Sequence, residues 1–171
     1  MHDYYEDVEV GATREFGSYE VTEAEILEFA RQYDPQSFHT DPEAAERSLF
    51  GGLIASGWHT AAMTMRMLVD GYLSESGAMG AIGVDELRWR NPTRPGYVLR
   101  LETEVEGKEP WQPGLGMVRS RVRTLADEGD GTGGTDGGDG TGDTEVMSMV
   151  GLLLFERRDQ EDAGGSGSDS I

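Results

Sequence analysis

The chain has 171 residues, of which 33 are acidic and 14 basic, giving a formal net charge of −19 at pH 7. This balance argues against nucleic acid as a partner, because binding to phosphate backbones requires clustered positive charge. Lys108 is the only lysine. An acidic surface with almost no lysine suggests adaptation to high cytoplasmic salt, as in halophilic archaea, because salt screens the self-repulsion. An ordinary acidic protein is the alternative.

The sequence contains no cysteine, which excludes disulfides, a thiol nucleophile and a thiolate metal site. Its first residues are polar and acidic, unlike a signal peptide, and no stretch approaches the roughly 20 apolar residues of a membrane span. We therefore expect a soluble cytoplasmic protein with no membrane partner. The length is sufficient for one domain with a sizeable core.

The first third of the chain predicts one strand and two short helices. The partly alternating residues 13–21 predict the strand, and Thr22 with Glu25 forms a capping box that opens a helix. This helix delivers the chain directly to Asp34. Pro42 and the surrounding acids favour the first turn of a second short helix over residues 41–46.

The longest helix is predicted from about Gly57 to about Leu73. Apolar residues spaced by three and four predict one buried stripe along it. The residues of this stripe are Trp58, Ala61, Met65, Leu68 and Tyr72. Further apolar residues beside the stripe indicate that much of the helix surface is buried.

After this helix the pattern changes to period-two alternation, which predicts strands over residues 81–89, 98–105, 116–125 and 146–156. The order predicts a single α+β domain over residues 1–158, with an antiparallel sheet wrapped around one long helix. Residues 127–143 consist almost entirely of Gly, Asp and Thr, so we expect a disordered acidic loop inserted in this domain. Residues 159–171 have a similar composition and predict a flexible tail.

Two short runs suggest the chemistry. Residues 34–39, DPQSFH, place Asp34 and His39 five apart with a proline between them. Because proline disfavours helix at the preceding residue, we expect a turn that aims both side chains at one place. Residues 50–59, FGGLIASGWH, lead from glycines into the long helix. An acid–base pair beside such a helix start suits addition or removal of water next to a carbonyl.

Residues 34–41 and 50–57 together resemble the hydratase motif of the MaoC-like acyl dehydratases, which include the R-specific enoyl-CoA hydratases. Residues 85–96 also resemble strands of that family, and the resemblance extends over about residues 7–156. It implies the hot-dog fold and a homodimer or higher homo-oligomer. It also implies a reaction that interconverts trans-2-enoyl-CoA and (R)-3-hydroxyacyl-CoA.

The resemblance implies a role for each motif residue. Asp34 and His39 match the catalytic pair, and Gly57 matches the glycine whose backbone N–H points at the thioester carbonyl. A helix N-terminus suits that role, because its free N–H groups and dipole favour negative charge. Ser56 and Trp58, beside Gly57, are further candidates for substrate binding. In characterised hydratases a serine follows the matching glycine by eight residues, whereas this chain has Met65, which leaves substrate details open.

Arg88, Arg90 and Arg94 are candidates for contacts with the phosphates of CoA, the alternative being ion pairs with nearby acids. Neither metal-ligand spacing nor a dinucleotide fingerprint is present, so we expect no metal and no cofactor besides the CoA thioester substrate. Two other functions remain open, a hot-dog acyl-CoA thioesterase and a non-catalytic acyl-CoA-binding subunit. Acyl length, branching and pathway are left open as well.

Overall fold

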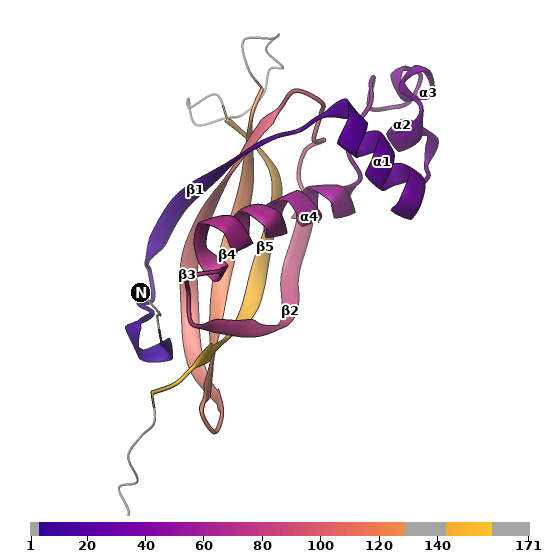
Figure 1. The fold of residues 1–171 in the computed structure, drawn as a ribbon. Helices are drawn as coiled ribbons and strands as arrows, with labels where there is room; N and C mark the ends of the chain where they lie inside the picture. Colours follow the sequence, from indigo (N-terminus) through magenta and orange to yellow (C-terminus); the bar gives the residue numbers. More distant parts are fainter. Residues whose placement is uncertain (1–3, 129–142, 159–171) are drawn as a thin grey trace, which may run out of the picture.

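The computed structural model describes residues 4–128 and 143–158 (Figure 1). Most of the loop predicted over residues 127–143, and the predicted tail over residues 159–171, lie outside the described residues. The elements in chain order are a 3₁₀ turn (Tyr5–Asp7), β1 (Thr13–Glu20), α1 (Glu23–Tyr33), α2 (Ser37–Thr40), α3 (Pro42–Glu46), α4 (Gly57–Leu68), a π-helical turn (Val69–Leu73), β2 (Ala78–Trp89), β3 (Val98–Gln112), β4 (Leu115–Asp127) and β5 (Asp143–Glu156).

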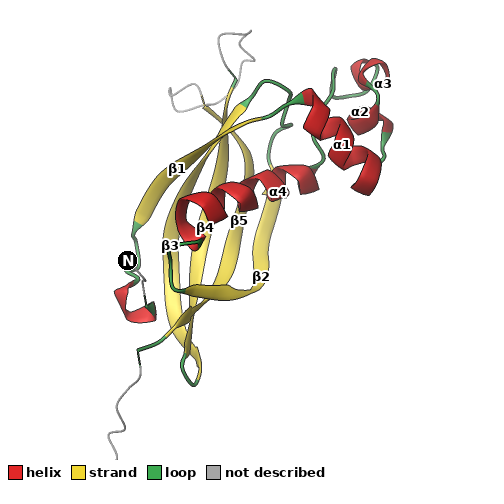
Figure 2. Ribbon diagram, viewed as in Figure 1, coloured by secondary structure: helices red, strands yellow, loops and turns green. Residues whose placement is uncertain are grey.

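The five strands form one antiparallel sheet in the order β1-β3-β4-β5-β2. The sheet curves around α4, which lies against one of its faces (Figure 2). The remaining three α-helices gather beyond one end of α4 (Figure 1). The predicted α+β architecture, a hot-dog sheet wrapped around a central helix, is therefore confirmed.

All predicted strands are present, and β3 continues seven residues beyond the prediction. Gly107 and Pro110 suggest a break after Val105, but β3 pairs with β4 as far as Gln112. Register shifts occur at both places, between Val105 and Gly107 and between Pro110 and Gln112. Such irregularities let a ladder continue past residues that fit it poorly.

The buried face of α4 differs from the predicted stripe. Trp58 is 60% exposed and Met65 46% exposed, whereas Met63 and Thr64 are almost fully buried. The prediction that Trp58 and Met65 face the core was therefore wrong. The helix also ends earlier than predicted, at Leu68, and passes into the π-helical turn.

Hydroxyl groups explain the choice of face. The hydroxyl of Thr60 lies 3.0 Å from that of Thr93, and the hydroxyl of Thr64 lies 2.7 Å from that of Thr124. Because these polar groups are satisfied inside the protein, their burial carries little penalty. The face of α4 toward the sheet therefore combines these hydroxyls with apolar side chains such as Met63, while Trp58 and Met65 face outward.

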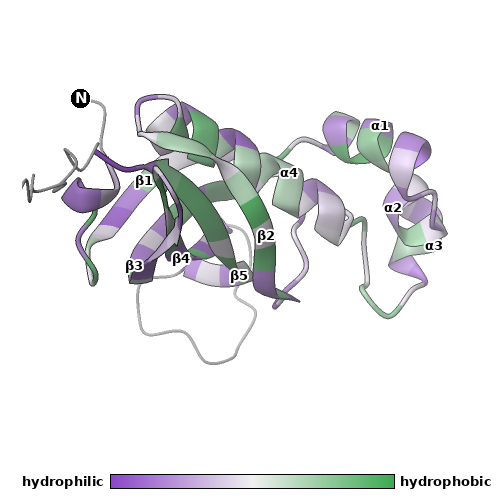
Figure 3. Cartoon of the chain, turned by 90° about the horizontal axis from the view of Figure 1, so that it is seen from below, coloured by the Kyte–Doolittle hydropathy of each residue, from purple (hydrophilic) through white to green (hydrophobic). Residues whose placement is uncertain are grey.

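The core lies between α4 and the sheet, and hydrophilic and hydrophobic bands alternate along the strands (Figure 3). Leu99 and Leu101 of β3 and Met147 of β5 are fully buried there. Met63 and Met67 of α4 belong to the same cluster. Burial of a side chain of this size contributes about 1.5–3 kcal/mol, so this layer is the main source of stability.

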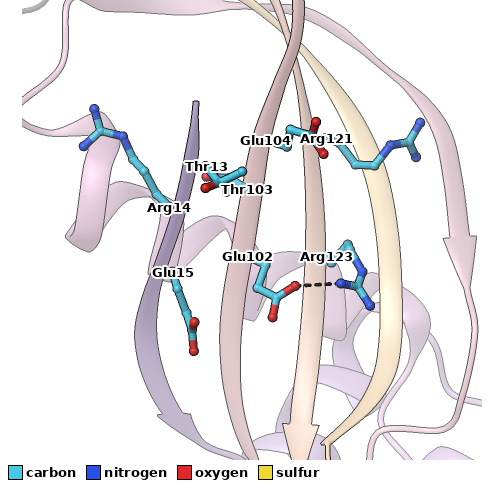
Figure 4. A pocket seen from close by; sticks show the side chains of 8 residues that line it. All are labelled: Thr13, Arg14, Glu15, Glu102, Thr103, Glu104, Arg121 and Arg123. Atoms are coloured by element: carbon cyan, nitrogen blue, oxygen red, sulfur yellow. Dashed lines mark hydrogen bonds and ion pairs between the residues drawn. The ribbon is translucent and has the colours of Figure 1, made fainter. Parts of the chain in front are cut away.

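The outer face of the sheet is charged. A hollow of about 340 Å³ lies across β1, β3 and β4 (Figure 4). Within it Arg123 lies 2.6 Å from Glu102, and Arg121, which also lines it, pairs with Glu86 of β2 at 3.0 Å. Arg121 and Arg123 are thus paired with carboxylates, whereas the guanidinium of Arg14 lies over the ring of Tyr72.

Candidate active site

Asp34 is placed by the end of α1. Thr22 caps the start of this helix, where its hydroxyl accepts the N–H of Glu25 at 3.3 Å. The backbone N–H of Asp34 still donates to Ala30, but its φ of −149° is no longer helical. Pro35 disfavours a helical conformation at Asp34, so the helix stops there and leaves the carboxylate at its end.

His39 lies on α2, a single helical turn. We predicted no regular helix in this segment, which is wrong for Ser37–Thr40, since Pro35 restricts only the residues around it. His39 is 5% exposed, and its Nδ1 lies 2.8 Å from the carbonyl oxygen of Ile54. Because a carbonyl oxygen can only accept, Nδ1 carries a proton.

The catalytic candidates meet across a short gap. Nε2 of His39 lies 3.5 Å from Oδ2 of Asp34. In a neutral ring with a proton on Nδ1, Nε2 is an acceptor, as is an ionised carboxylate. Two acceptors at this distance do not hydrogen-bond each other, so the pair is suited to hold one molecule that donates to both. A water molecule has the two O–H groups that this arrangement needs.

Both oxygens of Asp34 accept hydrogen bonds. Gln36 Nε2 donates to Oδ1 at 2.8 Å, and Ser56 Oγ donates to Oδ2 at 2.6 Å. Burial by itself would raise the pKa of Asp34, but the bonds from Ser56 and Gln36, together with the nearby His39, lower the pKa below the ordinary 3.8. Asp34 is therefore a carboxylate at neutral pH.

Gly57 is the first residue of α4, and its N–H makes no hydrogen bond within the described part of the chain. The indole of Trp89 packs directly on it, because a Cβ at residue 57 would lie 2.5 Å from Nε1 of that ring. Gly57 and His39 line a common hollow of about 300 Å³. The other lining residues are Phe38, Phe50, Ile54, Ala55, Thr60, Trp89, Arg90, Asn91, Pro92 and Thr93.

The structure separates the two neighbours of Gly57. Ser56 is 1% exposed, and its hydroxyl contacts Asp34. Trp58 is mostly exposed, is not among the lining residues, and forms an edge-on contact with Trp89, with ring centroids 5.3 Å apart. Met65 lies on the same exposed side of α4.

The three arginine candidates are dispersed. Arg90 lines the hollow, and its Nε donates to Ser148 at 3.2 Å and lies 3.4 Å from Glu145. Arg94 donates to the carbonyl oxygen of Phe50 at 2.6 Å, at the rim of the hollow. Arg88 bonds to a neighbouring backbone carbonyl in an exposed position. Arg90 is thus the one of the three that lines the hollow, and Arg94 contacts the lining residue Phe50.

Sequence reasoning missed most of the aromatic wall. Phe38 and Phe50 lie within the two motifs and contact each other, with ring centroids 5.2 Å apart. Their positions in the motifs were a usable signal. Trp89 comes from the end of β2, more than 30 residues later, and no local pattern identifies it.

The sequence matches the family described as MaoC like domain over residues 7–126, and the chain belongs to this family. The crystal structure of the MaoC-like dehydratase from Rhodospirillum rubrum is 39% identical, with a TM-score of 0.75, covering 91% of this chain and 98% of that one. R-hydratase PhaJ1 from Pseudomonas aeruginosa, 22% identical, has a TM-score of 0.67 over 92% of this chain and 88% of that one, which shows a common fold.

A further relative is the uncharacterized protein YdeM of Bacillus subtilis, 27% identical over 115 residues, which are 67% of this chain and 82% of that protein. Membership in the family supports hydratase or dehydratase chemistry in general. Within residues 4–128 and 143–158, no helix is both long and apolar enough to cross a membrane.

Proposed function

We propose that this protein is an acyl-CoA hydratase/dehydratase that interconverts trans-2-enoyl-CoA and (R)-3-hydroxyacyl-CoA. One observation carries the proposal. Oδ2 of Asp34 lies 3.5 Å from Nε2 of His39, and His39 lines the same hollow as Gly57 at the start of α4. Such a pair can bind and activate a water, and the helix N-terminus can stabilise an enolate oxygen.

The chemistry follows from these positions. In hydration, water donates one O–H to Asp34 and the other to His39. The water oxygen bonds to C3 of the enoyl thioester, and the C2=C3 electron pair moves toward the thioester carbonyl oxygen beside the N–H of Gly57. The proton lost by water passes through the pair and is delivered to C2, so one water is added in total. Dehydration is the reverse, and neither direction requires a cofactor.

The two members of the pair have different roles. The lowered pKa of Asp34 keeps it ionised at neutral pH, so it can accept a hydrogen bond from the water and is a poor acid. His39, fixed by its bond to Ile54, presents Nε2 to receive and release the proton. Because both groups lie on one side of the bound water, we expect water and proton to add to the same face of the substrate. The R configuration of the product is proposed from the resemblance to the R-specific hydratases.

We propose that CoA enters beside Arg90, whose side chain is half-exposed at the edge of the hollow. A guanidinium there can form charge-assisted bonds to phosphate. Arg94 holds the loop at Phe50 and is a second candidate. Arg90→Ala is expected to raise KM for an acyl-CoA more than for the matching acyl-pantetheine, which lacks the nucleotide phosphates.

We also propose that the protein pairs with a second copy of itself through the β2 edge of the sheet. This strand has 12 residues and exposes Met79, Ile82 and Val84. A long apolar edge strand is an unstable surface unless it is covered. Light scattering is expected to show a dimer, and Ile82→Lys is expected to shift it toward monomer. A wild-type monomer with full activity would contradict this proposal.

The activity is tested with a panel of trans-2-enoyl-CoA esters of rising length. Hydration is followed by loss of absorbance of the conjugated thioester, and hydrolysis by release of free CoA with a thiol reagent. Because the chain has no cysteine, such a reagent reports only CoA. We expect hydration without CoA release, and R product by chiral chromatography. CoA release as the main reaction would favour a thioesterase, and S product would contradict the proposed R specificity.

Substitutions test the catalytic pair. Asp34→Asn and His39→Ala are each expected to lower kcat/KM by at least about 100-fold, a typical loss for a positioned acid or base. Asp70→Asn is the matched control, since Asp70 pairs with Arg66 on an exposed part of the chain. Circular dichroism verifies the fold of each variant. Near-normal activity in a folded Asp34 or His39 variant would refute the assignment.

We further propose that folding and activity require molar salt, since the net charge of −19 leaves a large self-repulsion. The Debye length is about 3 Å at 1 M salt and about 30 Å at 0.01 M, so dilution exposes like charges to one another. Melting curves in potassium chloride from 10 mM to 3 M test this dependence. An unchanged melting temperature and full activity at the lowest concentration would contradict it.

A further inference from the structure

The hydroxyl of Ser56 joins two parts of the candidate site. Ser56 is the N-cap of α4 and is 1% exposed. Its Oγ accepts the backbone N–H of Trp58 at 3.3 Å and donates to Oδ2 of Asp34 at 2.6 Å. A serine hydroxyl has a single proton, so this proton is committed to the carboxylate while an oxygen lone pair caps the helix.

The bond fixes the oxygen that faces His39. Oδ2 of Asp34 receives the Ser56 hydroxyl and is the oxygen 3.5 Å from Nε2 of His39. The other carboxylate oxygen is held by Gln36, whose bond to Asp34 is exposed to solvent. Ser56 is therefore the buried partner of the carboxylate, and its loss would free Asp34 to rotate away from the histidine.

The same bond connects the carboxylate to the start of α4. Ser56 immediately precedes Gly57, the proposed donor to the thioester oxygen, and is held by the first turn of the helix. Ser56 thus links the water-activating group directly to the helix start that carries the oxyanion donor. Misplacement by about 1 Å can cost about 100-fold in rate, so a fixed distance between these groups is valuable.

We propose that Ser56 is a positioning residue, which aligns Oδ2 of Asp34 with His39 and ties it to the N-terminus of α4. This inference rests on the proposed hydratase function and extends it. His39 of α2 is the titratable side chain that faces Asp34, while Gln36 and Ser56 supply neutral donors. If removal of the Ser56 hydroxyl changes the protonation of Asp34, the change can thus be attributed to the lost hydrogen bond.

Kinetics provide the first test. Ser56→Ala removes the hydroxyl, and we expect kcat to fall by about 10- to 100-fold with KM changed less than threefold. Loss of a donor to the charged form raises the pKa of Asp34, so the acidic limb of the kcat/KM profile is expected to move to higher pH. Ser56→Thr retains a hydroxyl and is expected to restore most of the rate and the position of the limb.

Thr64→Val is the matched control. It removes another buried hydroxyl of α4, which bonds to Thr124 and does not line the hollow. We expect it to lower the melting temperature without moving the acidic limb. Should Ser56→Ala fail to fold, Ser56→Gly replaces it, because glycine is tolerated almost as well as serine at an N-cap.

A second measurement does not depend on turnover. Carbon-detected NMR of the Asp34 carboxyl, in a His39→Ala background, gives its pKa with and without Ser56→Gly. We expect a higher pKa without the hydroxyl. An unmoved pKa, together with kcat within twofold of wild type, would overturn the inference. A shifted pKa in a protein with no hydratase activity would support the inference and refute the proposed function instead.

Discussion

The contact between Gly57 and Trp89 predicts that Gly57→Ala is destabilising, against the usual preference for alanine in helices. Glycine costs about 0.5–1 kcal/mol relative to alanine within a helix, so propensity alone would favour the substitution. In this protein a Cβ at residue 57 would lie 2.5 Å from Nε1 and 2.6 Å from Cδ2 of Trp89. Ordinary contact begins at 3.4 Å and Cε2 of the ring lies nearest of all, so the ring must retreat by about 1 Å.

The expected loss of stability in Gly57→Ala depends on the contacts that Trp89 loses when its ring moves away. Overpacking typically costs about 1–3 kcal/mol, and the low end applies here because Trp89 is 48% exposed and can move outward. Its edge-on contact with Trp58 is worth about 0.5–1.5 kcal/mol. After the gain in helix propensity, we expect a net loss of about 1–2 kcal/mol. For a chain of this length that lowers Tm by about 2–8 °C.

Chemical denaturation in a double-mutant cycle tests this reasoning. Gly57→Ala is measured in wild type and in Trp89→Ala, where the clash is absent, and the cost should disappear in the second background. Gly107→Ala is the matched control, since a Cβ there meets nothing within 4 Å. An equal cost of Gly57→Ala in both backgrounds, or a more stable single variant, would show that the Trp89 contact is not the cause.

Two further predictions concern stability. Burial lowers the pKa of His59, partly offset by Glu25, so the unfolded chain binds more protons as the pH falls below 6.5 and stability is lost on acidification. Urea denaturation at pH 7.5 and 5.5 measures how much unfolding free energy is lost on acidification. This loss should be smaller for His59→Phe, which keeps the stacking on Phe29, than for wild type. An equal loss in both proteins would show that His59 is not its cause. Lys108 Nζ donates to the carbonyls of Tyr5 at 3.0 Å and Val8 at 2.6 Å. Lys108→Met should therefore lower the free energy of unfolding by about 1–3 kcal/mol. Arg66→Met, which removes an exposed ion pair with Asp70, should change it little. Equal effects of the last two variants would contradict a special role for Lys108.

Most helices and strands could be predicted from the sequence because each is signalled by residues close together in the chain. The Thr22 capping box predicts the start of α1, and period-two alternation predicts the strands, whose pairing then follows from short connections. Extension of β3 past Gly107 could not be predicted, because it depends on β4 continuing beside it.

The orientation of α4 was not predictable from hydrophobicity. Thr60 and Thr64 count as polar in the sequence, and only Thr93 and Thr124, which are distant in the chain, make their burial favourable. The apolar residues left outside, including Trp58, then form the surface beside β2.

The candidate site likewise has features that the sequence predicts and features that depend on the fold. Asp34, His39 and Gly57 stand in recognisable runs, and the structure brings Asp34 and His39 together and Gly57 into the hollow with His39. The bond from Ser56 to Asp34 spans 22 residues, and Trp89 reaches the hollow from β2, so both depend on the complete fold.

The buried hydroxyls of α4 also restrict how the helix can respond to change. Ser56, Thr60 and Thr64 follow at intervals of four residues, about 6 Å apart along the axis, and each bonds to a different element. A slide by one residue would rotate the helix by about 100° and break all three bonds together. The three hydrogen bonds therefore fix α4 in a single register against its neighbours, which a purely hydrophobic interface would not do. Substitutions among Phe38, Phe50 and Trp89 can consequently reshape the hollow while α4 keeps its register.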